Sequence, residues 1–337
     1  MSQPDSEKAD GTAWSAKSRF WRGVVWGTLT GWALVFLPYA ATLLVKHYDV
    51  KFNPGWEIGT YDYNFSLLLI LPVIQGLAGG LARGRETQTI PSGWGVMALI
   101  LILDFVGAVL FMREGIICLV MAFPLVVGLI GFGYAMGRGL VRWRRSRTVS
   151  MSLAPLIVLG VVVETAGPLP NQPQAVSDMV IVNAPPEYVW RYLVDYPENP
   201  NPSSYWLWQA GLPAPTHSVA AVPAVGAYRE CRFTGGYAYG EIITELEPGK
   251  RLAFRVTEQM KHPEIFGHVT FDEGEMVLTP AGRNRTRLTM IGRYRLHVRP
   301  VPYFAWWAED VTRHIHFRVM GYMKTLAERD YRADSGK

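Results

Sequence analysis

Long stretches without a single charged side chain occupy the N-terminal half of this 337-residue chain. Each is long enough to cross a hydrocarbon core about 30 Å thick as an α-helix. The three clearest are Gly23–Val45, Tyr63–Ala82 and Gly115–Gly137. Two more candidates contain one acid each, and they cover residues 90–112 with Asp104 and residues 148–167 with Glu164. We therefore predict an N-terminal all-α transmembrane bundle of about five helices over residues 20–168.

The placement of lysine and arginine predicts the orientation of this bundle, because cytoplasmic loops are enriched in both. One side would hold eleven basic residues: Lys8, Lys17, Arg19, Arg22, Arg83, Arg85, Arg138, Arg142, Arg144, Arg145 and Arg147. The other side would hold three: Lys46, Lys51 and Arg113. We expect a multi-pass protein of the cell (inner) membrane with a disordered cytoplasmic tail over residues 1–19. Five crossings would leave the C-terminal half periplasmic or otherwise extracytoplasmic. The net charge of +5 is then explained by the basic loops that orient the bundle in the membrane, and it does not indicate binding to nucleic acid.

Polar residues inside the predicted bundle need a physical reason. Asp104 lies mid-span, where an ionised side chain costs about 2.5 to 3.5 kcal/mol on insertion scales. Gln75 of the second predicted span is its candidate partner. The pair is either a proton or polar-ligand site or a hydrogen bond that fixes helix packing, and both readings stay open. Gly133 and Gly137 have the spacing of a close helix contact.

The C-terminal half has the composition of an α+β domain. A proline-rich linker over residues 169–176 precedes it, and the domain itself is predicted over residues 177–332, with a short tail at 333–337. A strand near Met179–Val182 leads to a helix opened by two prolines, and a second short helix is expected around residues 205–208. Strand-like segments joined by turns begin at Gly226. A helix of nearly thirty residues, from about Pro302 to Tyr331, ends the chain.

This order of elements resembles the helix-grip fold of the SRPBCC superfamily, also called START-like or polyketide cyclase/dehydrase-like. The segments that carry the resemblance are VNAPPEYVWRYLVDY, ELEPGKRLAFRV, TPAGRNRTRLTM and the long last helix. The resemblance implies a curved antiparallel sheet around a long C-terminal helix. It also implies an apolar cavity between sheet and helix for lipids, sterols, isoprenoids or polyketides. Some members are enzymes and many only bind a ligand, so the fold alone leaves the activity open.

Strand alternation and this resemblance together select candidate ligand-binding residues. Alternation places Arg229, Cys231 and Phe233 on one strand face, and the short helices of this family usually form a cavity mouth. The last helix should close the cavity with one apolar stripe. The complete candidate set is Trp206, Trp208, Arg229, Cys231, Phe233, Phe254, Met290, Tyr294, Trp307, Val311 and Ile315.

Two acids, an arginine and two histidines in the segment WWAEDVTRHIHF suggest a metal or acid/base site. His314 and His316 are two residues apart, and on a helix such a pair points in different directions, whereas zinc ligands prefer a spacing of four. We therefore predict no metal site. Asp310 and His314 do have that spacing, and they are either a general acid/base pair or a stabilising surface contact.

Three functions remain open from the sequence. The first is a membrane-anchored protein that binds a lipid or another hydrophobic small molecule, with the bilayer as its other partner. The second is a cyclase-like or hydrolase-like enzyme that uses Asp310 and His314, with Arg229 or Tyr239 as further candidates for proton transfer. The third is a membrane sensor or interaction protein centred on Asp104. We expect no cofactor and no nucleic-acid partner, and the two cysteines, Cys118 and Cys231, should not meet in a disulfide.

Overall fold

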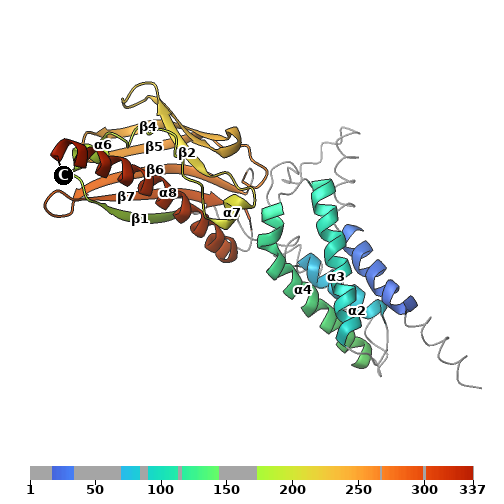
Figure 1. The fold of residues 1–337 in the computed structure, drawn as a ribbon. Coiled ribbons are helices and arrows are strands. Elements are labelled where there is room, and N and C mark those ends of the chain that lie inside the picture. The colour runs from blue at the N-terminus through green and yellow to red at the C-terminus, as the bar shows by residue number, and fades with distance from the viewer. Residues whose placement is uncertain are drawn as a thin grey trace, which may run out of the picture. The chain divides into compact units, whose positions relative to one another are not determined.

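The computed structural model describes residues 17–33, 70–83, 90–112, 116–143, 173–265, 268–298 and 301–336. The chain divides into two compact units, Met1–Pro168 and Leu169–Lys337. Helices make up the described part of the first unit, and the second combines one antiparallel sheet with helices (Figure 1).

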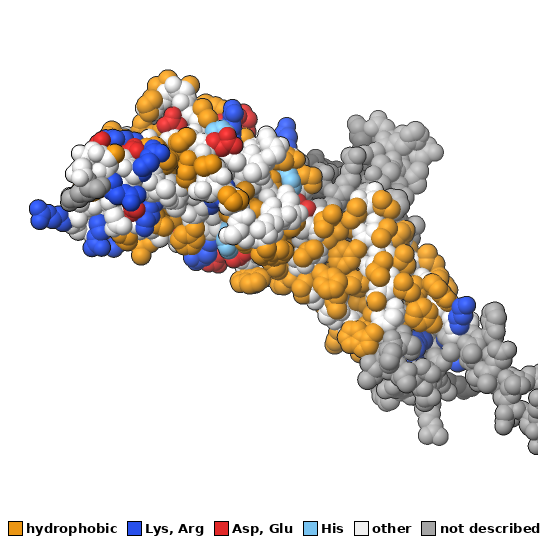
Figure 2. Space-filling view, in the orientation of Figure 1, with side chains coloured by type: hydrophobic (Ala, Val, Ile, Leu, Met, Phe, Trp, Pro, Cys, Tyr) orange, Lys and Arg blue, Asp and Glu red, His pale blue; other side chains and the backbone are white. Residues whose placement is uncertain are grey.

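The described helices of the N-terminal unit cover residues 17–33, α2 (Leu71–Ala82), α3 (Ile90–Gly107) and α4 (Ile116–Trp143). A π-helical turn, η2 (Ala108–Met112), continues α3. Two stretches are long and apolar enough to cross a membrane, Gly93–Leu110 and Ile116–Val141. Figure 2 shows hydrophobic side chains gathered over the surface of this unit.

The predicted count of about five spans is therefore not confirmed. Within the described residues, α2 falls in the second predicted span but has only 12 residues, which reach about 18 Å as a helix. Residues 34–45 of the first predicted span, residues 63–69 of the second and the whole of the fifth at residues 148–167 lie outside the described residues.

Paired glycines bring α2 and α4 into backbone contact. A Cβ atom added to Gly133 would lie 2.1 Å from the carbonyl oxygen of Val73, and one added to Gly76 would lie 2.1 Å from that of Ile130. One turn further along, a Cβ on Gly137 would lie 2.5 Å from the carbonyl oxygen of Leu77. No side chain fits between these backbones, so the close contact predicted from the Gly133 and Gly137 spacing is confirmed.

The C-terminal unit is built on one seven-stranded antiparallel sheet with the order β1-β7-β6-β5-β4-β3-β2. Its strands are β1 (Gln174–Val182), β2 (Pro215–Ala220), β3 (Tyr228–Phe233), β4 (Ala238–Glu247), β5 (Arg251–Glu258), β6 (Val269–Pro280) and β7 (Thr286–Leu296). Two short helices, α6 (Pro186–Trp190) and α7 (Trp206–Gln209), follow β1, and a 3-10 turn, η3 (Thr234–Gly236), joins β3 to β4. The edge strand β2 was not predicted, because its six residues begin with proline and show no clear alternation of apolar and polar side chains.

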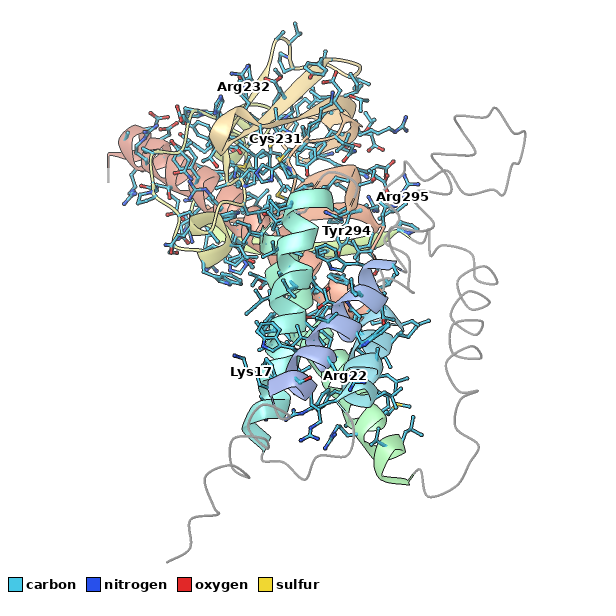
Figure 3. The ribbon with its side chains drawn as sticks, turned by 90° about the vertical axis from the view of Figure 1, so that its right-hand side faces the viewer. Lys17, Arg22, Cys231, Arg232, Tyr294 and Arg295 are labelled. Carbon is cyan, nitrogen blue, oxygen red and sulfur yellow. The ribbon has the colours of Figure 1, made fainter. Side chains whose placement is uncertain are left out.

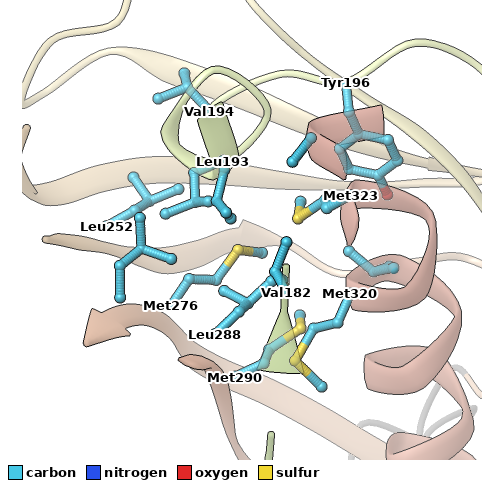
Figure 4. Packing of buried hydrophobic residues seen from close by; sticks show 14 of the residues in the cluster. Val182, Leu193, Val194, Tyr196, Leu252, Met276, Leu288, Met290, Met320 and Met323 are labelled. Atoms are coloured by element: carbon cyan, nitrogen blue, oxygen red, sulfur yellow. The ribbon is translucent and has the colours of Figure 1, made fainter. Parts of the chain in front are cut away.

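The long C-terminal helix α8 (Val301–Ser335) packs against the inner face of this curved sheet, as the helix-grip fold requires. Its C-terminal half closes the main hydrophobic core together with α6 and strands β1, β5, β6 and β7. Figure 4 shows Met320 and Met323 of α8 beside Leu193, Met276 and Leu288 in this core.

The buried face of α8 is rotated by roughly one residue from the predicted stripe. Phe304, Val319 and Leu326 are buried as expected, whereas Trp307, Val311 and Ile315 are only half-buried. Thr312 and His316 occupy the buried face in their place. The residues that pack against Thr312 and His316 lie on strands distant in the sequence. Helical periodicity alone could not predict those contacts, so the predicted stripe was misplaced.

Candidate ligand-binding site

An interior aromatic row crosses the sheet from β3 to β7. Neighbouring ring centroids lie 5.5, 5.4 and 5.8 Å apart along the row, which consists of Phe233, Tyr239, Phe271 and Tyr294. Ile315 of α8 and Met260 pack against it. Figure 3 shows Cys231 and Tyr294, which lie on β3 and β7. Aromatic rings from four strands and one half-buried face of α8 therefore meet inside the domain.

Buried hydroxyl groups of this domain, one of them in the row, have no hydrogen-bond partner in the described part of the chain. They include the Oη of Tyr239, in the row, and the Oγ1 of Thr312. Tyr239 is 6% exposed, and burial raises the pKa of its phenol well above the usual range. Burial also raises the pKa of Tyr294 to about 12 and that of the Cys231 thiol to about 12. These groups are therefore neutral at pH 7 and available as hydrogen-bond donors.

A fully buried ion pair borders the row. Arg229 of β3 is 1% exposed, and its Nη1 donates a hydrogen bond to Glu241 of β4. Its Nε also donates to the carbonyl oxygen of Val194 at 2.7 Å, and its guanidinium lies 5.1 Å from the ring centroid of Phe254. Burial raises the pKa of Glu241, and the charge of Arg229 opposes that rise. The pair ties the chain after α6 to the sheet.

A second set of buried polar side chains joins α8 to β1, and it was not predicted from the sequence. The Nδ1 of His316 lies 2.9 Å from one carboxylate oxygen of Asp178, and Nη1 of Arg313 donates to the other at 2.7 Å. Burial lowers the pKa of His316, although Asp178 opposes the effect. Gly292 makes room for the imidazole, because a Cβ there would lie 3.1 Å from Nε2. An Asp178–His316 pair 138 residues apart leaves no local signal in the sequence.

The predicted acid/base residues lie at the surface between α7 and α8. Asp310 accepts a hydrogen bond from Tyr205 at 2.5 Å, and the His314 ring stacks on the Tyr205 ring at 3.7 Å. The Nδ1 of His314 lies 2.8 Å from the backbone oxygen of Asp310 and 3.6 Å from its carboxylate Oδ1. Both side chains are about two-fifths exposed, at 41% and 40%. The two residues hold Tyr205 and α7 against α8.

The other predicted residues divide between the row and its surroundings. Phe254 and Met290 belong to the main core, and Val311 is half-buried on α8. Trp208 packs under Arg318, whose guanidinium lies 5.6 Å from the centroid of a Trp208 ring. The structure thus brings Cys231, Phe233, Tyr294 and Ile315 together and leaves the tryptophans outside. Phe271 and Met260 were missed, whereas Tyr239 is named by the enzyme hypothesis, and alternation along YAYGEII could also have placed it inside.

In the N-terminal unit, Gln75 and Asp104 meet as the sequence suggests. The Nε2 of Gln75 donates to Asp104 at 2.9 Å. Gly31 leaves room for this amide, because a Cβ there would lie 1.9 Å from the same nitrogen. Three helices therefore converge on the pair. Among the described residues, no cluster of three or more His, Cys, Asp or Glu has the arrangement of a metal site.

Comparison with known proteins defines the class of the C-terminal unit. Residues 173–328 match the family described as polyketide cyclase / dehydrase and lipid transport. This part of the chain is therefore a polyketide cyclase-like domain of the SRPBCC type, which agrees with the strand order and the long last helix. A search of curated proteins finds no match.

Solved structures similar to this domain include enzymes of different activity. The Zhui aromatase/cyclase of a Streptomyces species is 17% identical, covers 48% of this chain and 98% of its own, and has a TM-score of 0.35. Norcoclaurine synthase of Thalictrum flavum, in complex with dopamine and hydroxybenzaldehyde, is 13% identical, with coverage of 45% and 84% and a TM-score of 0.31. A Mesorhizobium loti protein is 21% identical, with coverage of 46% and 98% and a TM-score of 0.30.

Proposed function

We propose that this protein is a membrane-anchored binding protein that holds a lipid or another hydrophobic small molecule inside its C-terminal domain. The buried hydroxyl of Tyr239 lies among aromatic rings and has no hydrogen-bond partner among the residues that the structure describes, and this observation carries the proposal. A buried polar group without a partner costs about 1 to 3 kcal/mol. A bound molecule with an acceptor oxygen would satisfy it, and the rings would cover the apolar remainder.

The ligand site that we propose is the interior aromatic row with its neighbours on α8. Cys231, Phe233, Tyr294 and Ile315 would contact the ligand directly, and Arg229 would border it from its ion pair with Glu241. The family description, which names lipid transport beside polyketide cyclisation, supports a hydrophobic ligand. Binding is favoured over catalysis because Asp310 and His314 engage Tyr205 at the surface.

Membrane anchoring by the N-terminal unit is the second part of the proposal. Large apolar side chains on α3 and α4 are exposed, among them Ile102, Val106, Ile116, Phe123 and Phe132. Such a surface fits contact with lipid tails. Lys17 and Arg22 lie near the beginning of the first described helix, which suits a cytoplasmic N-terminus (Figure 3). Five spans over residues 20–168 would place the domain at 177–332 outside the cytoplasm.

Replacing Tyr239 with phenylalanine tests the ligand site. We expect Tyr239→Phe to weaken binding of a dansyl-labelled fatty acid about tenfold, because the variant loses a hydrogen bond of about 1.4 kcal/mol. The measurement is a fluorescence titration of the full chain in detergent. Tyr228→Phe is the matched control, since Tyr228 is 43% exposed and its loss should leave the affinity unchanged. Equal affinity in the wild type and Tyr239→Phe would contradict the assignment.

A further inference from the structure

Three tryptophans form an exposed aromatic surface at the beginning of α8. Trp306 is 63% exposed and Trp206 of α7 is 46% exposed. The Trp307 ring lies between them, 4.8 Å from the Trp306 centroid and 6.4 Å from that of Trp206. The Nε1 of Trp307 is buried without a hydrogen-bond partner in the described residues. We call Trp206, Trp306 and Trp307 the tryptophan face.

The tryptophan face lies at the end of the domain where the chain enters from the N-terminal unit. α8 and β1 run in the same direction, because Asp178 of β1 pairs with Arg313, and the backbone N–H of Asn183, just after β1, donates to Glu328 further along α8. The first turns of α8 therefore lie beside the beginning of β1 at Gln174. Figure 1 shows α7 and the beginning of α8 at this same end.

The interior aromatic row reaches the same end. Tyr294, the last ring of the row, is paired with Gln174 in the sheet register. At the other end of the row, Phe233 is paired with Pro215, the first residue of β2. The hairpin that joins β2 to β3 lies at the opposite end of the domain and exposes Val222 and Val225. One end of the domain thus combines chain entry, exposed tryptophans and the proposed ligand site.

We propose that the tryptophan face docks on the surface of the lipid bilayer, so that a hydrophobic molecule passes between the membrane and the aromatic row. Tryptophan favours the membrane interface, because its ring is apolar and its N–H can bond to headgroup oxygens. Trp306 and Trp206 present such rings at the surface of the domain. The chain enters the domain at this end, at Gln174 of β1, and membrane anchoring of the N-terminal unit would raise the effective concentration of the domain at the bilayer.

This inference rests on the proposed membrane anchoring, and photo-crosslinking of the full chain in nanodiscs tests both. The nanodiscs contain phosphatidylcholine with a fraction of a phosphatidylcholine that carries a diazirine at the top of one acyl chain. After irradiation, labelled peptides are identified by mass spectrometry. We expect lipid adducts on α3, α4 and the peptides that contain Trp206 and Trp306. In Trp206→Ser/Trp306→Ser the adducts at the tryptophan face should be lost, while those on α3 and α4 stay.

The control variant is Val222→Ser/Val225→Ser, which removes equally exposed apolar side chains from the opposite end and should leave labelling unchanged. Adducts on α3 and α4 without any at the tryptophan face would overturn docking and leave membrane anchoring intact. A lack of adducts on all helices would overturn both. Crosslinks from the tryptophan face to a second copy of the chain, in place of lipid, would also overturn the inference.

Discussion

Replacing Gly133 with leucine should destroy the packing of α2 against α4. A Cβ at this position would lie 2.1 Å from the carbonyl oxygen of Val73 and 3.0 Å from the backbone nitrogen of Leu77. These are backbone atoms, so no side-chain rotation can relieve the overlap, and the helices must separate. We expect a loss of about 3 kcal/mol or more in the stability of the N-terminal unit. Thermal unfolding of the full chain in detergent, followed by circular dichroism, measures it.

Gly128→Leu is the matched control for this prediction. Gly128 lies on the same helix and is exposed, and no described residue comes within 4 Å of a Cβ added to it. The control should unfold like the wild type. If Gly133→Leu unfolded at the same temperature as Gly128→Leu, the close α2–α4 contact would be wrong.

Removal of the Glu241 carboxylate should destabilise the C-terminal domain by about 3 to 5 kcal/mol, because it leaves the charge of Arg229 buried without its partner. Arg229 is 1% exposed and cannot reach solvent without opening the contact between the sheet and the chain after α6. Glu241→Leu should therefore accelerate hydrogen exchange in peptides from β3 and β4 of the full chain, measured by mass spectrometry.

Two variants sharpen this test. Glu230→Leu removes the acid of a neighbouring pair with Arg232, whose side chains are 30% and 51% exposed, and should cost at most about 1 kcal/mol. Arg229→Met combined with Glu241→Leu removes both charges and should recover part of the lost stability. Equal protection in Glu241→Leu and Glu230→Leu would refute a structural role for the buried pair.

Local periodicity in the sequence predicts a large part of this fold. Alternation places Arg229, Cys231 and Phe233 on one face of β3, and the structure buries Arg229 and Phe233. The apolar stripe at helical spacing in the last segment predicts α8. Glycine spacing predicts the contact at Gly133, because close helix packing leaves a regular pattern of small residues.

Long-range partners explain what the sequence could not predict. The buried face of α8 is set at Thr312 and His316 by Gly292 and Asp178, which lie on two different strands. The interior aromatic row likewise takes its rings from four strands, so its composition depends on the sheet order. The predicted pair of Asp310 and His314 has the right helical spacing. Tyr205 from a distant segment donates a hydrogen bond to Asp310 and stacks on His314, and helical spacing could not predict these contacts.

Native mass spectrometry of the full chain, released from detergent, tests the proposed binding function most directly. We expect the wild type to carry one hydrophobic molecule per chain, either retained from the cell or taken up from an added lipid extract. Ile315→Trp, which fills space beside the aromatic row, should keep its fold and lose that molecule. A folded wild type that takes up no molecule from the extract, or an Ile315→Trp variant with unchanged occupancy, would contradict a ligand site in this domain.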